Sequence, residues 1–248
     1  MFNGSAADSR CREVYVWDTY LKLTFIRPRG ARVREAALSK WFARTARRYM
    51  PTSVVTGHFF NGNTAVPRDL PWDERVRRFA AGWENALSEG MRLGMTVLFG
   101  FEFAADGAEF LACGIEPDFL FANPDLDRFS IRRFTDAVRA AGGITSLAHP
   151  FREASHLYQD TDAIEAVNEV HVNHPEFNRR AFEYAIDRGK PVTAGSDLHY
   201  APDINGSGML FDCEIRCGAD FVSAVMRREC RLIPCGEEYR YVPKNYTP

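Results

Sequence analysis

The chain has 248 residues, of which 46% are hydrophobic, 26% charged and 13% aromatic, and its formal net charge is −2. The near-neutral charge gives no general electrostatic attraction to nucleic acid or to an anionic membrane. No apolar run approaches the roughly 18 residues of a membrane-spanning helix, and residues 1–12 lack the apolar core of a signal peptide. We therefore expect a single cytoplasmic domain over residues 1–248, with neither membrane nor nucleic acid as a partner.

Short apolar segments alternate with segments of helical periodicity along the chain. The predicted strands are 12–26, 53–56, 96–103, 109–114, 144–148, 163–172 and 192–194, and the predicted helices are 33–49, 73–90, 130–141, 178–188 and 221–229. Strands that alternate with helices favour parallel βα units, and at this length a barrel of such units is the best fit. The predicted fold class is therefore α/β.

A polar segment rich in Gly, Asn and Pro follows the second predicted strand. Residues 59–95, which contain this segment and the helix after it, are a candidate lid insertion over a site. The alternative is that the aromatic residues Phe59, Phe60 and Trp72 only pack beneath a surface loop.

The cysteines near the C-terminus raise the question of a zinc site. Cys213 and Cys217 are spaced C-x3-C, and Cys230 and Cys235 are spaced C-x4-C. We expect reduced, independent thiols in a reducing cytoplasm, with a structural zinc site and disulfides as the alternatives.

Potential metal ligands stand at the ends of four predicted strands. They are His58, Glu102, His149, and the pair Asp197 and His199. Because the carboxyl ends of parallel strands meet on one side of a sheet, we expect these side chains to converge. Imidazole and carboxylate ligands suit zinc, manganese or iron, and Asp197 could instead act as a general base. The alternative is a separate structural role for each residue.

These segments resemble the PHP family (polymerase and histidinol phosphatase domains), whose members are metal-dependent phosphoesterases. The resemblance runs from about Asp18 to Phe211. Gly195–His199 is similar to the family's G-S-D-x-H, Ala148–Pro150 to A-H-P, Gly100–Glu102 to G-x-E, Thr56–His58 to T-D-H with Gly57 in place of Asp, and Glu169–Asn173 to a strand reading E-x-x-N.

The resemblance implies a distorted (β/α)7 barrel and a centre of two or three metals. It further implies that Glu102 bridges metals, that His149 and Asp197 each bind one, and that His58 and His199 share another. Where the family has a His after the bridging Glu, this chain aligns Glu109.

The first family motif is altered. Tyr20 and Lys22 align with the two histidines of H-x-H, and Arg27 aligns with a further ligand. A charged lysine or arginine does not bind a metal ion. The centre built from Glu102, Glu109 and His149 would keep three ligands and an open position.

Two interpretations follow. In the first, the chain is a hydrolase with one metal ion (zinc, manganese or iron) rather than three. Lys22 and Arg27 then act with Asp197 and His199 in catalysis and bind a small anionic, phosphorylated substrate. Tyr20 and Arg152 also bind that substrate. In the second, the chain is a metal-free relative with non-hydrolytic chemistry or a ligand-binding role. A third, structural alternative is that Lys22 and Arg27 form salt bridges that fill vacated space. The oligomeric state stays open.

Overall fold

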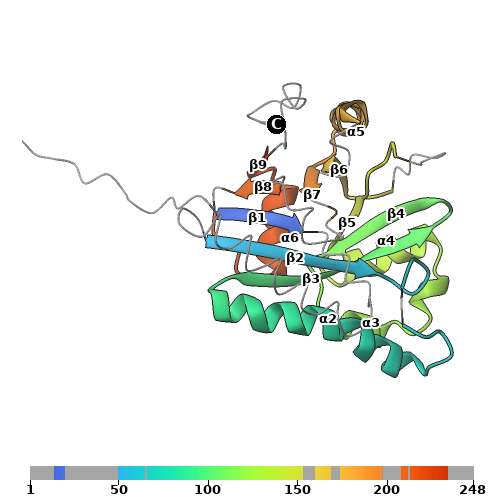
Figure 1. Ribbon diagram of the computed structural model, residues 1–248. Helices are drawn as coiled ribbons and strands as arrows, with labels where there is room; N and C mark the ends of the chain where they lie inside the picture. The colour runs from blue at the N-terminus through green and yellow to red at the C-terminus, as the bar shows by residue number, and fades with distance from the viewer. Residues whose placement is uncertain are drawn as a thin grey trace, which may run out of the picture.

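A curled mixed sheet forms the centre of the molecule (Figure 1). The computed structural model describes residues 14–19, 50–64, 66–152, 160–168, 174–195, 197, 208–211 and 213–233. The strands are β1 Val14–Thr19, β2 Met50–His58, β3 Thr96–Ala105, β4 Ala108–Cys113, β5 Ile144–Leu147, β6 Ala163–Asn168, β7 Val192–Gly195, β8 Gly208–Phe211 and β9 Cys230–Ile233. Their order in the sheet is β2-β3-β4-β5-β6-β7-β1-β8-β9.

The sheet curls because β1 pairs with both β2 and β7, which are the first and last strands of the run β2 to β7. It runs parallel to β2 along its whole length, and Asp18 also pairs with Gly195 of β7. The curl also brings together side chains of strands that are not neighbours. The hydroxyls of Ser146 on β5 and Thr193 on β7 lie 2.8 Å apart, although β6 lies between these two strands in the sheet.

The mixed α/β class is confirmed, whereas a complete barrel of seven βα units is not. Strand β4 is antiparallel to both β3 and β5, and β3 and β4 are joined by a tight turn instead of a helix. Asp106 and Gly107 form this turn with φ angles of 50° and 74°. Two successive positive φ angles are typical of a type I′ hairpin, for which Asp-Gly is a preferred sequence. The expectation of parallel βα units was therefore wrong at this hairpin.

Helices cover the outer face of the sheet. They are α2 Trp72–Leu93, α3 Asp118–Ala122, α4 Ile131–Ala140, α5 Pro175–Asp187 and α6 Gly218–Met226, with a short 3₁₀ helix, η1, at Leu126–Arg128. α2 packs along β3, α4 against β5 and α5 against β6 (Figure 1). The predicted helices 73–90, 130–141, 178–188 and 221–229 correspond to α2, α4, α5 and α6, whereas 33–49 lies outside the described residues.

The alternation of β3 separates the core from the interior of the curled sheet. Phe99 contacts Trp83 of α2, Phe101 contacts Phe119 of α3, and Phe103 stacks on Phe134 of α4 at a ring distance of 4.2 Å. Since successive side chains of a strand point to opposite faces, the residues between these phenylalanines point away from the helices. Glu102 is one of them, and it is fully buried.

The candidate lid contributes to the same core. Phe59 and Phe60 are buried and stack on each other, and both contact Trp72 at the start of α2. Movement of 59–95 as a lid stays a prediction. In the described part of the chain, none of the helices is long and apolar enough to cross a membrane.

Candidate functional site

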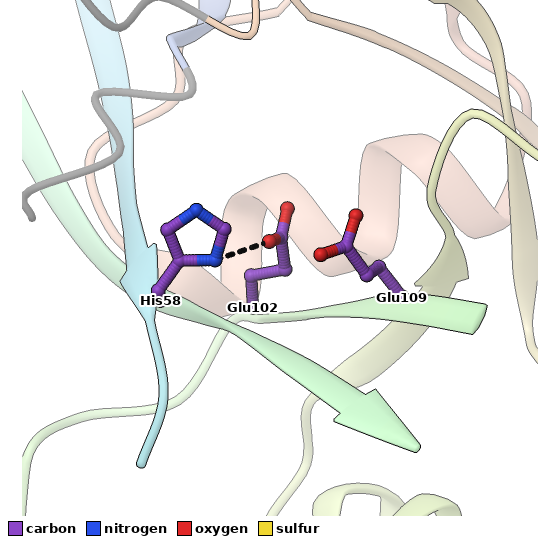
Figure 2. Close-up of side chains that lie close together, drawn as sticks. All are labelled: His58, Glu102 and Glu109. Atoms are coloured by element: carbon purple, nitrogen blue, oxygen red, sulfur yellow. Dashed lines mark ion pairs between the residues drawn. The ribbon is translucent and has the colours of Figure 1, made fainter. Parts of the chain in front are cut away.

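The polar site begins with two side chains on neighbouring parallel strands. His58, the last residue of β2, pairs in register with Glu102 of β3. Paired residues project to the same face of a sheet, and here Nδ1 of His58 lies 2.7 Å from Oε1 of Glu102 (Figure 2). Both side chains are buried, with 5% and 0% of their surface exposed. The register of β2 and β3 therefore fixes the first imidazole–carboxylate pair.

The hairpin adds a second carboxylate to this pair. Glu109 of β4 lies opposite Ala104, two residues beyond Glu102 on the same face of β3. Diagonal neighbours in an antiparallel pair are close enough for long side chains to meet. One ligand atom each from His58, Glu102 and Glu109 lies within 4.8 Å of the others, and the three side chains point toward one another (Figure 2).

We call His58, Glu102 and Glu109 the first half of the site. Two carboxylates this close repel each other, and a divalent cation between them would lower that repulsion. One nitrogen and two oxygens form a donor set that suits zinc, manganese or iron. The residues of the first half therefore fit a metal ion.

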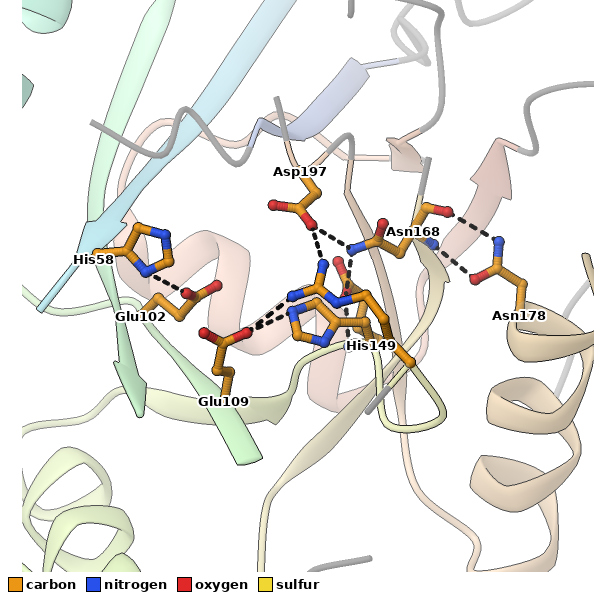
Figure 3. A network of polar contacts seen from close by, with 9 residues as sticks. His58, Glu102, Glu109, His149, Asn168, Asn178 and Asp197 are labelled. Carbon is orange, nitrogen blue, oxygen red and sulfur yellow. Dashed lines mark hydrogen bonds and ion pairs between the residues drawn. The ribbon is translucent and has the colours of Figure 1, made fainter. Parts of the chain in front are cut away.

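The second half of the site lies on the other side of Glu109 and consists of Glu109, His149, Arg152 and Asp197. Nε2 of His149 is 3.0 Å from Oε2 of Glu109. Arg152 donates from one guanidinium nitrogen to Oδ2 of Asp197 at 2.7 Å and from the other to Oε2 of Glu109 at 3.1 Å. A guanidinium thus links two carboxylates that come from β4 and from the end of β7 (Figure 3).

Arg152 keeps its positive charge in this position. Burial alone would lower the pKa of its guanidinium, but the carboxylates of Asp197 and Glu109 more than offset burial and raise that pKa above its ordinary value. The side chain is 22% exposed, and that of Asp197 is fully buried. The second half as arranged does not fit a metal ion, because the Arg152 guanidinium occupies one oxygen of each carboxylate and places a positive charge between them.

A chain of hydrogen bonds supports the second half from behind. The buried carboxylate of Glu165 accepts a bond from the backbone N–H of His149 at 2.7 Å and one from the side-chain amide of Asn168 at 3.2 Å. That same Asn168 amide lies 3.4 Å from Oδ2 of Asp197. Asn178 of α5 then holds the backbone of Asn168 through both its N–H and its carbonyl (Figure 3).

The backbone is strained where the second half leaves the strands. His149 follows β5 with φ of 26°, and Asp197 follows β7 with φ of 48°. A non-glycine residue with positive φ is uncommon, and such strain persists only where the surroundings fix it. The bond from the His149 N–H to Glu165 is one such constraint.

A cavity of about 340 Å³ opens beside Glu109 and His149. Its lining is formed mostly by small residues of the β3–β4 hairpin and of the turn after β5: Asn61, Ala104, Ala105, Asp106, Gly107, Ala108, Glu109, Leu147, Ala148, His149 and Pro150. Among the described residues that line it, none is Phe, Tyr or Trp. Asn61 keeps its wall in place, because its side-chain amide bonds to both the N–H and the carbonyl of Ala104.

The structure brings together all six of the described residues that the sequence predicted for the site. His58, Glu102, Glu109, His149 and Asp197 lie close together (Figure 3), and Arg152 joins Asp197 to Glu109. The predicted Tyr20, Lys22, Arg27 and His199 lie outside the described residues. Arg152, predicted as a substrate-binding residue, engages two carboxylates of the site itself.

Sequence analysis missed Glu165 and Asn168. It placed the E-x-x-N segment at 169–173, which lies outside the described residues, whereas Glu165-Ala166-Val167-Asn168 has that spacing and ends β6. The spacing itself was therefore the signal that would have found both residues. Asn178 left no comparable signal, because a polar residue on a helix is usually exposed.

The cysteine question is answered for the described residues. Cys113, Cys213, Cys217 and Cys230 form no disulfide with one another. The group of His58, Glu102 and Glu109 is the one set of clustered metal ligands found in the described part of the chain. Cys11 and Cys235 lie outside that part.

Comparison with known proteins supports the PHP resemblance. The family model described as PHP-associated matches residues 175–230, which run from the start of α5 to the start of β9. No curated protein matches the sequence significantly.

Two solved structures share the fold. One is a two-domain protein from Bacteroides vulgatus ATCC 8482 that contains a predicted PHP-like metal-dependent phosphoesterase, with 13% identity and a TM-score of 0.62 over 90% of this chain. This chain spans 65% of the length of that protein. The other is PsfC from Pseudomonas syringae PB-5123, with 16% identity and a TM-score of 0.61, covering 92% of this chain and 93% of PsfC. At these identities the likeness concerns the fold. The family match over residues 175–230 and the shared fold both agree with the PHP resemblance of the sequence.

Proposed function

We propose that this protein is a phosphoesterase that works with one divalent metal ion, held by His58, Glu102 and Glu109. The observation that carries the proposal is the first half of the site, where an imidazole and two carboxylates converge at ligand distances. Glu102 is fully buried and Glu109 is 24% exposed, so the pair would offer an ion one protected and one accessible carboxylate. An ion bound there supplies Lewis acidity and an activated water for hydrolysis.

The other residues of the site would bind and orient a small phosphorylated substrate. The cavity beside Glu109 and His149 has room for a small alcohol group, and among the described residues its lining contains no Phe, Tyr or Trp ring on which a nucleobase would stack. His149 lines this cavity, and Glu109 orients its imidazole through Nε2. His149 is therefore the described side chain best placed to exchange a proton with a substrate oxygen.

The residues outside the described part keep their predicted roles in this proposal. Lys22 and Arg27 would grip the phosphate as fixed cations, with Tyr20 beside them. His199 would act together with Asp197, as the family resemblance implies. The metal is zinc, manganese or iron by the chemistry of the donor set.

Metal content and hydrolysis test the proposal together. Protein purified without added metal, and protein reconstituted with Mn²⁺ or Zn²⁺ after chelation, would be measured by elemental analysis and assayed on a panel of phosphate monoesters. We expect about one ion per chain and hydrolysis that is lost on chelation and restored with metal. Near-zero occupancy after reconstitution would contradict the proposal.

A pair of histidine variants makes the test specific. His58→Ala removes a ligand and is expected to abolish both ion binding and hydrolysis. His174→Ala is the matched control, because His174 is exposed, pairs with Glu176 at 3.3 Å and lies at the start of α5. Equal ion content in the two variants would exclude His58 as a ligand.

A further inference from the structure

The second half of the site contains the donors of another metal centre. Glu109, His149 and Asp197 offer two carboxylates and an imidazole, and Oε2 of Glu109 is already 3.0 Å from Nε2 of His149. Asp197 is fully buried and Glu109 is shared with the first half. In composition this set equals the first half, which we propose as the metal centre.

Arg152 makes the two halves different. Its two terminal nitrogens bind Oδ2 of Asp197 and Oε2 of Glu109, which is one oxygen of each carboxylate in this set. A guanidinium bound in this way places positive charge between the two carboxylates. A divalent ion entering the same space would compete for these two oxygens and meet a like charge.

We propose that Arg152 is an internal cation that fills a second metal position, and that a divalent ion binds to Glu109, His149 and Asp197 only when this side chain is absent or withdrawn. The inference rests on the proposed one-ion function and adds the reason why the centre holds one ion. In this inference Arg152 excludes the second ion. The sequence instead attributed the loss of metal sites to Lys22 and Arg27. The two explanations therefore differ in which substitution should let a second ion bind.

The side chain of Asp197 is also positioned by contacts other than those with Arg152. Its Oδ2 lies 3.4 Å from the side-chain amide of Asn168. That amide also donates to Glu165, and Asn178 holds the backbone of Asn168. These contacts do not involve Arg152. Removing the guanidinium therefore leaves the ligands close to their present positions, and a second ion would share Glu109 with the first.

Titration with Mn²⁺ alone tests the proposal. Chelated full-length protein would be titrated while free Mn²⁺ is followed by electron paramagnetic resonance. We expect one ion per wild-type chain and two per Arg152→Met chain. The two ions should show the exchange coupling of a pair bridged by one carboxylate. Asp197→Asn added to Arg152→Met should return the number to one.

Two control variants test whether the effect depends on the positive charge at residue 152 and not on the loss of any arginine nearby. Arg152→Lys keeps a cation and should stay at one ion. Arg180→Met removes the guanidinium that lies 4.2 Å over the neighbouring Phe151 ring, outside the second half, and should also stay at one ion. Circular dichroism would confirm folding, and Arg152→Gln carries the same expectation as Arg152→Met if the latter fails to fold.

The outcomes distinguish this inference from the proposed function. Two ions in the wild type, one ion in a folded Arg152→Met or Arg152→Gln variant, or two ions in Arg152→Lys would overturn the role of Arg152. Absence of any ion in the wild type would overturn the proposed function. In that case a gain of one ion in Arg152→Met would still support the filled position.

Discussion

Glu109 lies between two groups of side chains, each of which contains a buried carboxylate whose negative charge must be balanced. The two groups balance that charge in different ways. On one side are His58 and Glu102, in the geometry of metal ligands. On the other side Arg152 neutralises Asp197 and Glu109 with a guanidinium. Both groups lie close together, and both contain a fully buried carboxylate (Figure 3).

The two halves differ because their residues come from different kinds of backbone segment. The first half comes from regular strand pairs, in which register alone aligns His58 with Glu102 and places Glu109 diagonally. The second half comes from residues just beyond strand ends, where His149 and Asp197 have positive φ angles. The side chains of the first half are positioned by the pairing of their strands. The positions of His149 and Asp197 depend in addition on hydrogen bonds with Glu165 and Asn168. The two halves should therefore respond differently to mutation.

Glu109→Gln should have the largest effect, because Glu109 serves both halves. It removes one carboxylate from the proposed ion and one partner from Arg152. We expect Mn²⁺ affinity to fall by about 100-fold or more. This is at least the largest loss of metal affinity that is typical when a residue supporting a ligand is mutated. Isothermal titration calorimetry would measure it.

Glu116→Gln is the control for Glu109→Gln. Glu116 follows β4 on an exposed loop and lines a different cavity. Unchanged Mn²⁺ affinity in both variants would remove Glu109 from the metal centre.

Glu165→Ala should disturb the second half and spare the first. The change leaves the buried N–H of His149 without its carboxylate acceptor and breaks the bond to Asn168. Loss of a buried hydrogen bond to a charged group costs about 1–3 kcal/mol of unfolding free energy. Denaturant unfolding would measure the loss, with Glu183→Ala on the exposed face of α5 as the control. Binding of one Mn²⁺ should survive, and its disappearance would show that the halves are not separable.

The strands and two residues of the first half, His58 and Glu102, could be read from the sequence because their signals are local. Apolar runs that end in His58, Glu102 and His149 predicted both the strand ends and a shared site, and the structure places these residues together. The Asp106-Gly107 hairpin also has a local signal, which the assumption of parallel βα units overrode. Its antiparallel strand is what brings Glu109 beside Glu102.

The pairing of Arg152 could not be read in the same way. Asp197 is 45 residues from Arg152, and Glu109 is 43 residues away. The sequence suggested Lys22 and Arg27 as the cations that form salt bridges in the site, and Arg152 as a substrate-binding residue. A long, flexible arginine can meet an acid in a substrate, in solvent or in its own site, and only the fold selects among these. The network behind it spans shorter separations, with Asn178 10 residues beyond Asn168, but it joins a strand to a helix.

Asn178→Ala should give the smallest effect, because Asn178 acts on the site through two other residues. Its side-chain amide holds the N–H and the carbonyl of Asn168, at 3.1 Å and 3.0 Å, where β6 ends. Losing both bonds should cost about 1–2 kcal/mol of unfolding free energy. Denaturant unfolding would measure this loss against Arg179→Ala, which changes the exposed neighbour on the same helix. In the Arg152→Met background, Asn178→Ala should also weaken the second Mn²⁺ more than the first, because Asn168 orients Asp197. Equal weakening of both ions would mean that α5 supports the whole site and not its second half alone.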